Sequence, residues 1–127
     1  MSSITGIHHV SMKTSTPDEY QKTVHFYSEV LELPIVRTWA KGIMFDTSNG
    51  IIEIFNDGEG SLSKGMIRHY AFAVSDVDSV VARVKEAGYE VFVEPKDIVI
   101  QSEVPYPARI AFCFGPLGEE IEFFMER

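Results

Sequence analysis

The sequence repeats itself, and this repeat restricts the possible folds more than any other feature. The segment Ile67-Arg68-His69-Tyr70-Ala71-Phe72-Ala73-Val74 matches Ile7-His8-His9-Val10-Ser11-Met12-Lys13-Thr14 in register. Each copy is followed by a helix-start signal and an apolar helical stripe. A chain made of two copies of one unit places equivalent residues at equivalent positions, so a feature that recurs in both copies is informative.

Both copies alternate in the way that strands do, with successive side chains on opposite faces. In the second copy His69 points away from the face that carries Tyr70 and Phe72. In the first copy His9 takes the same place. The alternation therefore pairs His9, not His8, with His69.

A helix is predicted after each repeat segment, and three strands after each helix. Thr16-Pro17-Asp18-Glu19 forms a capping box, and Pro34 ends the helix; Ser75 or Asp76 caps the second helix, and Gly88 stops it. Each unit thus reads β-α-β-β-β. The first helical stripe consists of Tyr20, Val24, Tyr27 and Leu31, with Phe26 off its centre, and the second of Val77, Val80, Val81 and Val84. The expected strands of the first unit are about 4–13, 35–40, 42–46 and 51–56. Those of the second unit are the repeat segment that begins at Ile67 and about 90–94, 110–114 and 120–125.

The fold class is therefore α+β, in one domain spanning 1–127 that contains a first module at 4–57 and a second module at 66–127. A Gly- and Ser-rich stretch at 57–65 joins the modules. Segment 96–106 fits either strand or loop, Gly115-Pro116-Leu117-Gly118 forms the last hairpin turn, and Pro105-Tyr106-Pro107 is expected in a loop.

The composition narrows the classes of partner. With 19 acidic residues against 11 Lys and Arg, the net charge is -8, which argues against binding nucleic acid. No apolar run approaches the roughly 18 residues of a membrane span, and the first residues lack a secretion signal. We expect a soluble cytoplasmic protein that does not bind a membrane. Cys113, the single cysteine, lies between aromatic residues and is expected to be a buried structural thiol.

The last strands of the two units also match each other. Ile52-Glu53-Ile54-Phe55 corresponds to Ile121-Glu122-Phe123-Phe124, with a carboxylate between large apolar residues in each. A buried carboxylate costs several kcal/mol unless it is paired or bound to a metal. Taken singly, each Glu would instead be an ordinary residue on a solvent-facing side of a sheet. A carboxylate between apolar residues occurs at the equivalent place in both units. The sequence therefore predicts one divalent metal site with four ligands: His9, Glu53, His69 and Glu122.

These residues resemble a known family, the vicinal oxygen chelate superfamily, which includes glyoxalase I, extradiol dioxygenases, methylmalonyl-CoA epimerase, and fosfomycin and bleomycin resistance proteins. The resemblance covers almost the whole chain. It is carried by Ile7-His8-His9-Val10, Phe26-Tyr27-Ser28-Glu29-Val30-Leu31, His69-Tyr70-Ala71-Phe72-Ala73-Val74-Ser75-Asp76 and Glu120-Ile121-Glu122. One departure lies at Leu31-Glu32-Leu33-Pro34, where a Gly usually follows the Leu.

The resemblance implies paired βαβββ modules, the glyoxalase/bleomycin resistance/dihydroxybiphenyl dioxygenase-like fold, whose mixed sheet forms a cup around a metal. Among family members, the Glu at the end of the first unit looks like glyoxalase I, a lactoylglutathione lyase. This implies Ni or Zn, with Co, Mn or Fe as other options, and proton transfer through an enediolate. It also implies that Glu122 acts as the base, with Glu53 as the second candidate, and that the protein is a homodimer. The metal is then held either within one chain or by modules of two chains.

The substrate is expected to be a small molecule with adjacent oxygens. Arg37, Lys41 and Arg109 are the cations available for substrate carboxylates, although ordinary surface positions fit them as well. Trp39, Phe45, Phe55, Phe112 and Phe114 could line an apolar pocket or fill the core. Two other functions stay open: an Fe(II) extradiol-type dioxygenase, and a metal-free protein that binds a small molecule such as an antibiotic.

Overall fold

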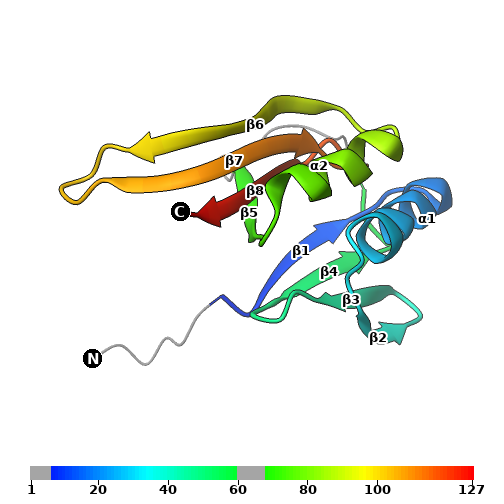
Figure 1. Ribbon diagram of the computed structural model, residues 1–127. Coiled ribbons are helices and arrows are strands. Elements are labelled where there is room, and N and C mark those ends of the chain that lie inside the picture. The colour runs from blue at the N-terminus through cyan, green and yellow to red at the C-terminus, as the bar shows by residue number, and fades with distance from the viewer. Residues whose placement is uncertain (1–6, 60–67) are drawn as a thin grey trace, which may run out of the picture. The chain divides into compact units, whose positions relative to one another are not determined.

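A computed structural model describes residues 7–59 and 68–127 (Figure 1). The contacts within the chain divide it into two compact units, Met1–Ser61 and Leu62–Arg127. The start of the first predicted module, 4–6, the start of the second, 66–67, and most of the predicted linker lie outside the described residues. Among the residues that are described, no helix is long and apolar enough to cross a lipid bilayer.

The first unit has the predicted β-α-β-β-β order. Its sheet is mixed, with strand order β1-β4-β3-β2, and β1 runs parallel to β4 while the other pairs are antiparallel. Thr16 caps the helix as predicted, because its hydroxyl accepts a hydrogen bond from the backbone N–H of Glu19 at 3.1 Å. The elements are β1 (His9–Lys13), α1 (Pro17–His25), η1 (Phe26–Val30), β2 (Ile35–Trp39), β3 (Gly42–Asp46) and β4 (Ile51–Phe55).

The second unit repeats this topology. Its strand order is β5-β8-β7-β6, with β5 parallel to β8. Asp76 caps the helix, and Gly88 ends it with a positive φ of 90°, a conformation that glycine adopts without steric cost. The elements are β5 (His69–Ala73), α2 (Val77–Glu86), β6 (Val91–Ile100), β7 (Tyr106–Phe114) and β8 (Glu120–Glu126).

Each sheet buries one face against its own helix, as the alternation predicted. In the first unit Ile52 and Ile54 are 3% and 0% exposed, and in the second Ile121 and Phe123 are 0% and 1% exposed. Helix α2 packs on β6, β7 and β8. The residues that alternate with these apolar side chains, including Glu53 on β4 and Glu122 on β8, point to the opposite face of their sheet.

The first helix differs from the prediction in its second half. It continues from α1 into a π-helical turn, η1, in which the N–H of Leu31 donates to the carbonyl of Phe26 at 2.9 Å. The helix buries the face formed by Thr23, Phe26, Tyr27 and Val30, so Phe26, which was predicted off the stripe, is fully buried beside Tyr27. Glu32 then adopts a φ of 59°, a left-handed conformation that favours glycine.

The hairpin of β6 and β7 resolves the segment that fitted either strand or loop. Strand β6 extends to Ile100, and β7 begins at Tyr106. Pro107 pairs with Val99, so the predicted loop at Pro105-Tyr106-Pro107 is wrong for Tyr106 and Pro107. Pro107 is accommodated because its place near the end of the hairpin is one where a missing N–H is tolerated.

Candidate metal and substrate site

The first unit brings His9 and Glu53 together. They lie on adjacent parallel strands, where the register aligns His9 with Ile51 and Ser11 with Glu53, so the two side chains are diagonal neighbours on one face. Nε2 of His9 lies 3.7 Å from Oε1 of Glu53. Glu53 is only 7% exposed, and an ionised carboxylate in such a place needs a compensating positive charge.

The second unit repeats the arrangement with His69 and Glu122. Ala71 pairs with Glu122 in the register, as Ser11 pairs with Glu53, and Nε2 of His69 lies 3.3 Å from Oε1 of Glu122. Burial raises the pKa of Glu122 above that of an ordinary carboxyl, and the nearby His69 offsets this only in part. The carboxyl therefore holds a proton more readily than a surface glutamate.

The chemistry of these two pairs fits a divalent cation. Each pair offers one imidazole nitrogen and one carboxylate oxygen, a donor set used for Zn²⁺, Ni²⁺ and related ions. Ligands about 2.0–2.2 Å from one ion lie roughly 3 Å from each other when adjacent, so separations of 3.3 and 3.7 Å need little movement. Within residues 7–59 and 68–127, no group of three or more such side chains is formed. The joining of the two pairs on one ion stays a prediction.

Two of the predicted substrate residues of the first unit lie on the same face as Glu53. Arg37 is aligned with Met44, which is itself aligned with Glu53, and the guanidinium of Arg37 lies 4.0 Å from the sulfur of Met44. The indole of Trp39 packs edge-on against Phe55, with ring centroids 5.6 Å apart. Arg37 and Trp39 thus share this face with the His9–Glu53 pair, with strand β3 between β2 and the strand of Glu53.

Phe45, also predicted to contact substrate, lies elsewhere. It is fully buried, and its ring centroid is 6.0 Å from that of Tyr27, on the helix-packed face of the sheet. It faces the core because it alternates with Met44 and lies across from Ile52, which is buried on that face. We therefore assign Phe45 a core role.

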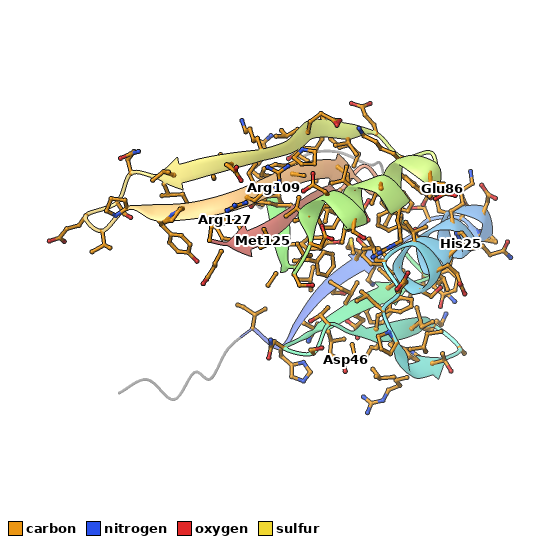
Figure 2. All side chains as sticks on the ribbon, in the orientation of Figure 1. His25, Asp46, Glu86, Arg109, Met125 and Arg127 are labelled. Carbon is orange, nitrogen blue, oxygen red and sulfur yellow. The ribbon has the colours of Figure 1, made fainter. Side chains whose placement is uncertain are left out.

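The cation Arg109 also differs from the expectation for a substrate ligand. Its guanidinium makes two hydrogen bonds of 2.8 Å to the carboxylate of Asp78 on α2, and it reaches Asp97 at 3.3 Å. The hydrogen bonds with Asp78 raise the pKa of Arg109 and lower that of Asp78. Arg127 joins the same group at 3.0 Å from Asp97, and both arginines lie along the sheet of the second unit (Figure 2). Arg109 on β7 thus links its sheet to helix α2 through the ion pair with Asp78.

The aromatic side chains beside His69 form the apolar part of the second unit's face. Phe112 is aligned with Glu122, and its ring meets that of His69 edge-on at 5.2 Å. Phe92 stacks on Phe114 at 4.3 Å and lies 5.5 Å from Phe112. The prediction named Phe114 and Phe112 but not Phe92. Strand alternation would have found Phe92, because it lies between Val91 and Val93 and therefore points to the opposite face from them.

Burial also explains Cys113. The thiol is fully buried in β7, and this raises its pKa to about 12. A thiol with such a pKa stays protonated at neutral pH and is a poor nucleophile. The predicted structural role of this cysteine is consistent with its place in the core.

Comparison with known proteins points to one family. The family model of the Glyoxalase/Bleomycin resistance protein/Dioxygenase superfamily matches residues 6–123. No curated protein sequence matches the chain closely enough to count as a relative. The matched range includes both pairs of His and Glu.

Solved structures share the fold at low sequence identity. A glyoxalase family protein from Bacillus anthracis is 20% identical, with a TM-score of 0.74, over 100% of this chain and 99% of that chain. A lactoylglutathione lyase from Agrobacterium tumefaciens is 15% identical, with a TM-score of 0.67, over 96% and 94%. The fosfomycin resistance protein FosX from Listeria monocytogenes is 20% identical, with a TM-score of 0.72, over 96% and 93%. These likenesses establish the fold.

Proposed function

We propose that this chain, which belongs to the Glyoxalase/Bleomycin resistance protein/Dioxygenase superfamily, is a metal-dependent lyase or isomerase of the glyoxalase type, acting on a small molecule with adjacent oxygens. The observation that carries the proposal is the repeated His–Glu pair. The two pairs occupy the same register positions in both units, at 3.7 and 3.3 Å, on the face that the helices leave open. In both units the carboxylate of the pair is largely buried, and a bound cation would offset the cost of that burial.

His9, Glu53, His69 and Glu122 would hold the ion, with Ni or Zn as the leading candidates. When bound, such an ion lowers the energy of negative charge that develops on substrate oxygens. The proton itself needs a group of the protein. Glu122 suits this role because a carboxylate ligand can leave the ion and accept the proton, and burial raises the pKa of this carboxyl when no cation is bound. Glu53 is the second candidate.

Each unit offers a substrate side chains of a different kind. On the second unit, Phe92, Phe112 and Phe114 offer apolar contact beside His69 and Glu122, and they exclude water from the reacting atoms. On the first unit, Arg37 offers a positive charge on the same face as Glu53, and Trp39 offers a flat apolar surface. This combination suits a substrate with an apolar group and one anionic or strongly polar end.

The proposal is tested by replacing the base without removing its shape. Glu122→Gln should reduce turnover of a 2-oxoaldehyde–thiol adduct at least about 100-fold, because an amide cannot accept the proton. Glu120→Gln is the matched control, since Glu120 lies two residues away on the same strand and face. It is aligned with His69 but is not one of the four predicted ligands. Binding of Zn²⁺ or Ni²⁺ by each variant is measured separately by calorimetry. Rates like those of the wild type in Glu122→Gln would rule out this assignment.

Metal content separates the proposal from the other two functions. Protein purified without a metal-affinity tag should contain a stoichiometric divalent ion and should turn over substrate under anaerobic conditions. Bound iron with consumption of O₂ would instead indicate a dioxygenase. A protein without stoichiometric metal and without turnover would indicate a binding module. We also propose a cytoplasmic homodimer, for which light scattering after size-exclusion chromatography measures the mass.

A further inference from the structure

His8 precedes His9 in the sequence but is not the histidine that the repeat pairs with His69. The structure places its ring against His9, a predicted metal ligand. Nδ1 of His8 lies 2.9 Å from Nδ1 of His9, and the two rings meet edge-on with centroids 5.2 Å apart. Neighbouring residues inside a strand point to opposite faces, but His8 lies just before β1, which begins at His9. The N–H of Ile51 donates to the carbonyl of His8 at 3.0 Å and holds its backbone in place.

The contact between the two rings restricts where their protons lie. A neutral imidazole has one nitrogen that donates and one that accepts. A hydrogen bond between two Nδ1 atoms therefore requires one ring to carry its proton on Nδ1 and the other on Nε2. Whichever direction the bond takes, it ties up Nδ1 of His9 and leaves Nε2 as the atom that faces Glu53 at 3.7 Å.

Cation binding would fix the direction of this hydrogen bond. A ring nitrogen that binds a cation carries no proton, so His9 bound through Nε2 must keep its proton on Nδ1. That proton needs an acceptor, and Nδ1 of His8 lies within hydrogen-bond distance of it. The His9 side chain is 42% exposed, so packing alone leaves its ring free to turn.

We propose that His8 is a positioning residue, which anchors Nδ1 of His9 and so presents Nε2 to Glu53 and to a divalent cation; the cation part rests on the proposed function. Groups that orient a ligating histidine typically change metal affinity about 10–100-fold when they are removed. In the second unit the corresponding residue is Arg68, whose guanidinium lies 3.9 Å from Glu120. There the ring of His69 instead packs against the ring of Phe112 in a T-shaped contact. The two pairs thus orient their histidines by different means.

The test compares three variants in their affinity for Zn²⁺, measured by competition with a chelating dye. His8→Phe keeps a flat ring but has no acceptor, and should bind Zn²⁺ about 10–100-fold more weakly. His8→Asn places an amide oxygen near the position of Nδ1 and should recover most of the affinity. Arg68→Ala, at the equivalent position of the other unit, should bind like the wild type. The proposal is overturned if His8→Phe binds as tightly as the wild type, or if His8→Asn is no better than His8→Phe.

A second measurement needs no cation, and it separates this proposal from the proposed function. In ¹⁵N-labelled, cation-free protein at about pH 9, well above the usual pKa of an imidazole, the wild type should show a ¹⁵N–¹⁵N coupling between the two Nδ1 atoms across the hydrogen bond. The coupling should be retained in Glu122→Gln. Its absence from the wild type overturns the positioning role, whatever the Zn²⁺ titration shows. Its presence supports that role even if the wild type binds no Zn²⁺, a result that would count against the proposed function alone.

Discussion

Gly42 offers the sharpest test of the face that carries Trp39. A Cβ atom added at Gly42 would lie 2.6 Å from the backbone oxygen of Ile54 and 3.0 Å from Cζ2 of Trp39. Ile54 lies on the central strand β4, so its backbone cannot move without disturbing the sheet. The indole of Trp39 lies over the glycine, and its contact with Phe55 at 5.6 Å depends on that close approach.

The expected cost of Gly42→Ala follows from two opposing effects. Forcing a methyl group into this space typically costs about 1–3 kcal/mol. Replacing Gly by Ala also restricts the unfolded chain, which stabilises the protein by about 0.4–1 kcal/mol. We therefore expect a net loss of about 1–2 kcal/mol, which at this chain length lowers the melting temperature by roughly 4–8 °C.

Gly50→Ala is the matched control. The nearest atoms to a Cβ at Gly50 are the backbone oxygen of Ile7 and the hydroxyl of Thr47, both at 3.5 Å, which is ordinary van der Waals contact. This variant should be as stable as the wild type or slightly more stable. The comparison removes the general effect of replacing a glycine in the first unit.

The assay follows urea unfolding by circular dichroism and by fluorescence. Trp39 is the single tryptophan of the chain, so the emission of the folded state reports directly on its indole. In Gly42→Ala we expect a red-shifted emission together with the loss of stability. The reasoning fails if Gly42→Ala keeps the wild-type stability and emission, or if Gly50→Ala is destabilised to the same extent.

Three further predictions concern other parts of the chain. Glu32 has a φ of 59°, a conformation that glycine tolerates, so Glu32→Gly should be more stable than Glu32→Ala by about 1 kcal/mol in urea unfolding; equal stabilities would refute the strain. Burial raises the pKa of Glu122 in the folded state, so ionisation destabilises the cation-free protein as pH rises from 4.5 through the raised value. The melting temperature of Glu122→Gln should therefore exceed that of the wild type increasingly with pH over this range, and a constant difference would contradict the shift. Cys113, fully buried with a pKa of about 12, should react with a thiol reagent only as fast as the protein unfolds, so rapid labelling of the folded protein would count against its burial.

The sequence by itself determined the repeat and the faces of its strands. Because strand side chains alternate strictly, the positions of His9, Glu53, His69 and Glu122 in the sequence were enough to place each pair on the open face of its own sheet. The helix cap at Thr16 also followed from local chemistry, since the hydroxyl and the N–H it binds are only three residues apart.

Only the tertiary structure decided the contacts that depend on geometry across elements or on an irregular turn. Arg109 is committed to Asp78 because α2 packs across β7, and no spacing in the sequence reveals that pairing. The first helix buries Phe26 more deeply than Tyr20 or Val24, because the sheet on which a helix packs decides which of two adjoining apolar faces is covered, and periodicity alone does not reveal that choice. His8 reaches His9 for a related reason: it lies outside the strand, where alternation no longer separates neighbours.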